Sequence, residues 1–184
     1  MLVSIVIIAI VVILFLYAVS VYNGLVRKKT EMEEGWSSID VFLKKRYDLI
    51  PGLVETVKGY ATHEKETFEN ITKARNLAQN ASSVDEQGKA ESALKNSMVN
   101  LFAVAENYPD LKANRNFSEL QNELSSLEDD IEMTRRYYNG TVKENNIAIE
   151  SFPSNIFANM FNFSKGEFFE IENSIEKEPV KISF

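Results

Sequence analysis

The stretch LVSIVIIAIVVILFLYAVSV, from Leu2 to Val21, decides the fold of this chain. Only Ser4, Tyr17 and Ser20 within it are not plainly apolar. A helix rises about 1.5 Å per residue, so the stretch would cover roughly 30 Å, the thickness of a bilayer's hydrocarbon core. Because a backbone in lipid must satisfy its own hydrogen bonds, we predict a membrane-spanning anchor over residues 1–22.

The alternative for this stretch is a cleaved signal peptide, since residues 18–20, Ala-Val-Ser, resemble a cleavage site. No positive charge precedes the apolar run, and the run is longer than the apolar region of a signal peptide. These two features favour an uncleaved anchor. Arg27, Lys28 and Lys29 follow it, and the positive-inside rule places the rest of the chain in the cytoplasm.

The composition of the remaining chain excludes several kinds of site. About 160 residues follow the anchor, enough for one domain with its own core. Cysteine is absent, which excludes disulfides, thiol catalysis and an acylated cysteine. His63 is the single histidine, whereas a zinc site normally needs several His or Cys ligands. We therefore expect no metal and no cofactor, and the net charge of -7 argues against nucleic acid as a partner.

Apolar periodicity over residues 23–151 predicts an all-α domain, an antiparallel up-down-up-down bundle of four long helices. The first helix has a heptad-like seam from Leu25 to Ile50, typical of helices packed at shallow angles as in coiled coils. Only Gly24 weakens its junction with the anchor, so we expect one continuous helix. We expect Pro51 to end that helix and to open the second one.

The later elements are predicted from turn residues and apolar seams. Residues 80–88 form a turn region with Asp85 as the N-cap of a third helix, which ends at Pro109. A fourth helix carries a regular seam from Phe117 to Tyr138. Beyond it, residues 152–184 predict a short amphipathic helix over Ser154–Phe161 and then an extended, Phe-rich tail.

Ordered motifs occur along nearly the whole chain. They are YNGLV (Tyr22–Val26), WSSIDV (Trp36–Val41), KRYDLIPGLV (Lys45–Val54), YATHE (Tyr60–Glu64), Ala74-Arg75, ENYPDLKAN (Glu106–Asn114), Asn116-Phe117, RRYYN (Arg135–Asn139), Asn145-Asn146 and Phe152-Pro153. In these motifs the chain resembles the LemA family of bacterial and archaeal membrane proteins. The resemblance implies an N-terminal membrane helix and a long helical bundle, and it implies no established catalytic activity.

Polar residues near two prolines form a candidate partner-binding pole. Counting from the turns places Pro51 and Pro109 at the end of the bundle far from the membrane. The polar residues expected to meet there are Arg46, Asp48, Tyr108, Asp110, Asn114 and Asn116. Arg46 could bind a partner's carboxylate through two hydrogen bonds. The alternative is that Asp and Asn side chains cap helix ends while Arg46 pairs with Asp48 or Asp110.

A second set of residues is expected at the membrane interface, where tyrosine is favoured. The triplets that begin at Tyr22 and Tyr138 are nearly identical and should lie level with each other. The candidate interface residues are Tyr22, Asn23, Tyr138, Asn139, Phe157 and Phe161. This register would bring Asn145, Asn146 and Glu150 toward the hydrocarbon, so either the register is wrong by a few turns or the fourth helix leans away. The aromatic tail could enter the interface or pack back onto the bundle.

Glu64 and Arg75 lie on an otherwise apolar seam of the second helix. His63 adjoins Glu64, but helical neighbours point about 100° apart, so the pair does not converge for acid–base chemistry. We expect Arg75 to form a buried ion pair with another helix, for instance with Glu91. No nucleophile, metal cluster or phosphate loop accompanies these residues, so we expect no enzyme.

These features predict a single-pass membrane scaffold or adaptor that presents a rigid bundle to protein partners. Its expected partners are the bilayer, through the N-terminal helix, an unidentified protein and a second copy of the chain. The alternative is a membrane-surface organiser that binds lipid through the aromatic C-terminal tail.

Overall fold

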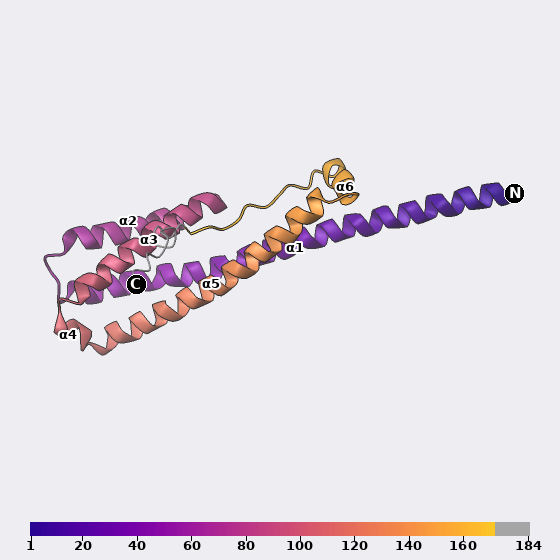
Figure 1. The fold of residues 1–184 in the computed structure, drawn as a ribbon. Helices are drawn as coiled ribbons and strands as arrows, with labels where there is room; N and C mark the ends of the chain where they lie inside the picture. The colour runs from indigo at the N-terminus through magenta and orange to yellow at the C-terminus, as the bar shows by residue number, and fades with distance from the viewer. Residues whose placement is uncertain (172–184) are drawn as a thin grey trace, which may run out of the picture. The chain divides into compact units, whose positions relative to one another are not determined.

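The structure is a computed structural model that describes residues 1–171, and the last part of the predicted tail, residues 172–184, lies outside this range. The described residues are helical or irregular, without a strand. The helices are α1 (Leu2–Lys58), α2 (Lys65–Gln79), α3 (Val84–Ala105), α4 (Pro109–Lys112), α5 (Arg115–Glu150) and α6 (Ser154–Met160) (Figure 1). They form two compact units, which we describe separately: Met1–Ser38 with Thr134–Glu167, and Ile39–Met133 with the described residues 168–171.

The first part of α1 is a candidate membrane span. Among the described residues, α1 is the one helix long and apolar enough to cross a bilayer, and none of its apolar window is buried within the protein. Unpaired apolar side chains around the whole circumference of a helix are typical of a helix that lies in lipid. The predicted continuity of the anchor with the first domain helix is confirmed, because α1 runs unbroken past Gly24.

The prediction that Pro51 ends the first helix is wrong, because α1 continues through Pro51 to Lys58. Proline has no N–H, so the carbonyl of Tyr47, four residues earlier, loses its helical partner. Arg75 of α2 replaces that partner, since its Nε donates to the Tyr47 carbonyl at 2.6 Å. The last turns of α1 also bury Leu53 and Val57 completely, which favours their helical conformation.

The next two helices consequently begin elsewhere than predicted. The second helix, α2, starts at Lys65 rather than at Pro51. The third helix, α3, has Ser83 rather than Asp85 as its N-cap, because the Ser83 hydroxyl accepts from the Glu86 amide at 3.2 Å. The Glu86 carboxylate in turn accepts from the hydroxyl and amide of Ser82, which lowers the pKa of Glu86. This reciprocal arrangement is close to a capping box.

Side chains of the later part of α1, of α2, α3 and α4, and of the first part of α5 contribute to the core of the second unit. Helices α2 and α3 lie side by side (Figure 1). At the start of α5, the Asn114 side chain accepts from the Phe117 amide at 3.1 Å, which is the capping role considered for it. The core side chains include Ile39, Leu43, Ile50, Leu53, Ile71, Leu94, Leu101, Leu111, Leu124 and Phe169.

In the first unit, the end of α5 packs against the middle of α1. The rings of Trp36 and Tyr138 lie 5.3 Å apart. A Cβ added at Gly35 would lie 3.3 Å from the Tyr138 Cα, so glycine permits this close approach of the two backbones. Closer to the N-terminus of α1, Lys28 forms an ion pair with Glu144 of α5.

This packing corrects the expected level of Tyr138. Tyr138 lies beside Trp36 rather than beside Tyr22, so the predicted register is wrong by several turns. The conflict over Asn145 and Asn146 disappears, because both side chains instead approach the segment that follows α6. Asn146 exchanges two hydrogen bonds with the backbone of Gly166, at 3.0 and 2.8 Å.

The segment after α6 is extended, and its described residues contact helices of the unit to which they belong. In the first unit, the Tyr138 hydroxyl donates to the Glu167 carbonyl at 2.9 Å. In the second unit, Phe169 is fully buried next to Gly88 of α3. Of the two alternatives for the tail, its described extended part therefore packs on the helices. The predicted short helix over Ser154–Phe161 agrees with α6 to within one residue.

We expect Arg75→Ala to lower the free energy of unfolding by about 1–3 kcal/mol, because it removes a charged donor from the Tyr47 carbonyl. In a Pro51→Ala background the loss should shrink, since the amide of residue 51 can then donate to that carbonyl. Chemical unfolding of the full chain in detergent, followed by circular dichroism, measures both values. An equal loss in the two backgrounds would show that Arg75 stabilises the protein through another contact.

Gly88→Ala should displace the extended segment, because its Cβ would lie 2.2 Å from the backbone oxygen of Glu170. We expect faster hydrogen exchange in residues 168–170 and a lower stability as Phe169 loses burial. Gly52→Ala is the matched control, since its Cβ would meet no atom within 4 Å. That substitution should stabilise the helix by up to about 1 kcal/mol. Unchanged exchange in the Gly88 variant would contradict the close packing.

Candidate functional site

Arg46 of α1 is a buried charge of the second unit, and its side chain is 1% exposed. One guanidinium nitrogen forms an ion pair with Glu91 of α3, which is also buried, and the other bonds to Glu128 of α5. The prediction that Arg46 lies at a partner-binding pole is therefore wrong, as is its alternative pairing with Asp48 or Asp110. The expected pair of Arg75 with Glu91 is also wrong, because Arg46 occupies that carboxylate.

Neutral side chains complete the surroundings of the Glu91 carboxylate. The Tyr47 hydroxyl donates to Glu91, and the Gln87 amide donates to both, at 2.8 Å to the Tyr47 oxygen and 2.9 Å to the carboxylate. Burial raises the pKa of Tyr47 to about 12, so the phenol stays protonated and keeps its role as a donor. Arg46 and Glu91 are buried, whereas the Glu128 side chain is 37% exposed, and the network connects α1, α3 and α5.

The sequence contains one indication of this network, which the prediction of a partner-binding pole did not use. Arg46 fills a gap in the apolar seam of its helix, and Glu91 lies between the apolar positions of α3. A charge on a buried seam requires an opposite charge on another buried seam. Periodicity alone does not say which of the available acidic residues provides it.

The remaining pole residues lie in different surroundings. Asn114 donates to the Tyr60 hydroxyl at 3.0 Å, which joins the loop after α1 to the start of α5. Asp48 lies on α1, away from that loop, because α1 continues past Pro51. Asp110 is exposed on α4 and Tyr108 precedes it, half-buried. Partner binding by Tyr108, Asp110 and Asn114 stays a prediction.

The structure places the candidate interface residues in different surroundings. Tyr22 makes edge-on ring contacts with Phe161 and Phe163, at centroid distances of 4.8 and 5.9 Å. Phe157 is half-buried against the small core of Leu25, Ile149 and Ala158. Tyr138 is buried, so its ring does not lie at a lipid interface. Asn23 is exposed on α1, whereas Asn139 is half-buried on α5 beside Tyr138.

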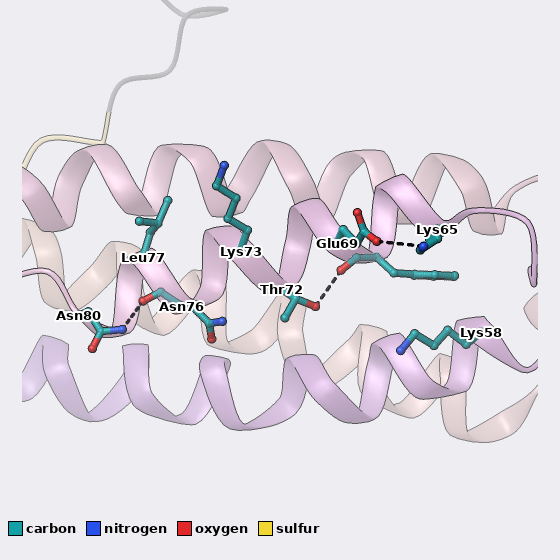
Figure 2. A pocket seen from close by; sticks show the side chains of 9 residues that line it. Lys58, Lys65, Glu69, Thr72, Lys73, Asn76, Leu77 and Asn80 are labelled. Atoms are coloured by element: carbon teal, nitrogen blue, oxygen red, sulfur yellow. Dashed lines mark hydrogen bonds and ion pairs between the residues drawn. The ribbon is translucent and has the colours of Figure 1, made fainter.

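An open groove that the motif analysis did not predict runs along the exposed face of α2 and has a volume of about 750 Å³. Figure 2 shows that Lys58 of α1 closes one end of it, whereas the other lining residues come from α2 and the residue after it. They are Lys65, Phe68, Glu69, Thr72, Lys73, Asn76, Leu77 and Asn80. Three of the lining residues are lysines and one is a glutamate, in an acidic chain, and Lys58 also pairs with Glu55 at 2.9 Å.

The polar groups in the groove are used locally or point outward. Thr72 and Asn80 bond to the carbonyls of Phe68 and Asn76, and Lys65 pairs with Glu69 at 3.7 Å (Figure 2). The Lys58 ammonium lies 5.8 Å from the centre of the Phe68 ring. Among residues 1–171, no three His, Asp or Glu side chains gather closely enough to hold a metal ion.

We expect Glu91→Ala to cost about 3 kcal/mol in unfolding free energy, because it leaves the Arg46 guanidinium buried without its main partner. The double variant Arg46→Met with Glu91→Leu should restore most of this loss, since apolar groups of similar size then fill the site. Chemical unfolding of the three proteins in detergent provides the comparison. A double variant less stable than Glu91→Ala would contradict this account of the network.

Comparison with known proteins places these features in a family. The model of the LemA family matches residues 35–184. Protein LemA of Metamycoplasma hominis is 30% identical over 157 residues, which cover 82% of this chain and 70% of that protein. Magnetosome protein MamQ 2 of Paramagnetospirillum magneticum is 25% identical and Magnetosome protein MamQ of Magnetospirillum gryphiswaldense 21%. The match to each MamQ protein spans 64% of its length. With a matching family model over most of its length, this chain belongs to the LemA family.

Proposed function

We propose that this protein is a membrane-anchored helical adaptor that binds an acidic segment of a protein partner in the groove along α2. The observation that carries the proposal is the chemistry of the groove, in which Lys58, Lys65 and Lys73 surround apolar surface. Leu77 contributes to that surface and is 55% exposed. Carboxylates of a partner would pair with the lysines while its apolar side chains cover Leu77.

The groove favours a helical segment as the occupant. Helix α2 has 15 residues and is about 22 Å long, so a partner helix of similar length could lie beside it. Such a segment would present acidic residues toward Lys65 and Lys73 and apolar residues toward Phe68 and Leu77, as amphipathic helices do in grooves.

The anchor supports a role at a membrane. Arg27, Lys28 and Lys29 directly follow the apolar part of α1, which favours a cytoplasmic position for the helices beyond it. Hydrogen bonds from Lys28 to Glu144 and Glu31 raise the Lys28 pKa. Relatives named as magnetosome proteins are consistent with membrane association, and no biochemical activity is carried over from them.

The second unit serves in this proposal as a rigid support, the antiparallel four-helix bundle expected from the sequence. The buried pair of Arg46 and Glu91, together with the partly exposed Glu128, ties three helices together. The proposed role is non-enzymatic, and the Thr72 hydroxyl donates to the Phe68 carbonyl of its own helix.

A photo-crosslinking residue at Asn76 in the full chain, in native membranes, tests the proposal. We expect one discrete protein product, whose cross-linked peptide is rich in Asp, Glu and apolar residues. The variant Lys65→Glu with Lys73→Glu should abolish that product through charge repulsion. The matched control is Lys44→Glu with Lys45→Glu, which reverses two exposed lysines of the same unit outside the groove.

Three outcomes would contradict the proposed partner. A product that survives in the Lys65/Lys73 variant shows binding independent of the groove's charge. A product made of two copies of this chain identifies self-association instead. Cross-links to lipid alone would place the groove against the membrane rather than against a protein.

A further inference from the structure

A second surface, distinct from the groove, lies beside the end of the anchor. It consists of α6 with its flanking residues, 151–164, which we call the α6 segment. Val21 and Leu25 of α1 pack with Ala158 of α6 and Ile149 of α5 in one small core. The ring contacts of Tyr22 with Phe161 and Phe163 add to this attachment. The α6 segment is thus held against α1 at Val21–Leu25.

That attachment places the α6 segment at the end of the apolar run. The run ends at Val21, and the first charged residue of the chain is Arg27. The residues between them belong at the boundary between hydrocarbon and water, if the run spans the bilayer as we propose. A segment packed on Val21 and Leu25 therefore lies at the same depth, next to the lipid.

The outward side of the α6 segment is apolar. Phe152 is 82% exposed, Ile156 51%, Met160 65% and Phe161 50%. The helical spacing of Ile156 and Met160 puts them on one face of α6. Asn155 and Asn159 occupy other positions around this short helix, which gives it polar sides. Exposed apolar groups gathered in this way mark a surface that is covered by something else.

The charge pattern identifies the covering surface as lipid rather than an ionic partner. Residues 151–164 contain no Asp, Glu, Lys or Arg, in a chain with 26% charged residues. The nearest charges on either side, Glu150 and Lys165, form an ion pair with each other. An uncharged segment with apolar side chains enters the bilayer interface without electrostatic help from anionic headgroups.

We infer that the α6 segment inserts into the bilayer interface beside the anchor, with Phe152, Ile156, Met160 and Phe161 among the lipid chains. Phe157, expected from sequence to share this role, and Phe163 instead attach the segment to α1. The anchor and the α6 segment then form two contacts with one leaflet. This second contact restricts how far the first unit can tilt or rotate in the membrane. A single membrane-spanning helix does not impose that restriction.

The absence of cysteine in the chain permits a direct test by site-specific labelling. The full chain carrying Met160→Cys is labelled with an environment-sensitive fluorophore and reconstituted into phosphatidylcholine vesicles. We expect blue-shifted emission and a loss of fluorescence in vesicles made with brominated lipid. Met133→Cys is the matched control, because Met133 is also an exposed methionine, 58% exposed, on α5. Its label should show neither change.

The outcomes separate lipid contact from other coverings. Equal, water-like emission at both positions would overturn the inference. A blue shift at Met160 without quenching by brominated lipid would also overturn it, since a protein then covers the segment. Quenching that requires anionic lipid would contradict uncharged insertion. The labelled variant Ile156→Asp with Met160→Cys gives a further check, because a charge on the inserted face should reduce the quenching.

Discussion

The guanidinium of Arg46 has to be compensated inside the second unit, and the packing of three helices depends on this constraint. Removing such a group from water costs several kcal/mol unless carboxylates and hydrogen bonds replace the water. Glu91 on α3 and Glu128 on α5 supply the carboxylates, while Tyr47 and Gln87 satisfy the remaining oxygen of Glu91. Moving any of these helices by one turn would separate the charges. The pairing therefore selects one register among those that apolar seams alone would allow.

A second constraint comes from Pro51 and determines how α1 reaches the groove. The orphan carbonyl of Tyr47 takes a donor from Arg75, so α1 continues and places Lys58 at the end of the groove along α2. A proline that would end an isolated helix is thus accommodated by a neighbouring helix. The basic character of the groove depends in part on this continuation.

In the first unit, the packing of Tyr138 on Trp36 determines where α5 ends. Gly35 allows the two helices to approach closely, and α5 then runs on until Ile149 meets Leu25. Helix α6 follows directly and packs at the end of the apolar run. The depth of the apolar α6 surface is therefore a consequence of the register between α1 and α5, which the sequence analysis placed several turns away.

Properties that depend on neighbouring residues could be predicted from the sequence: the candidate membrane span, the uninterrupted passage through Gly24, the helical class and the bounds of α6. Hydrophobicity and periodicity are sums over adjacent positions, so they require no tertiary information. The partners of Arg46 and Arg75, the continuation through Pro51 and the level of Tyr138 depend on residues distant in the chain. Arg46 and Glu128 are 82 positions apart, and Tyr47 and Arg75 are 28 positions apart. Only the tertiary structure decides these, because a buried charge or an orphan carbonyl is satisfied by whichever group packing brings near it.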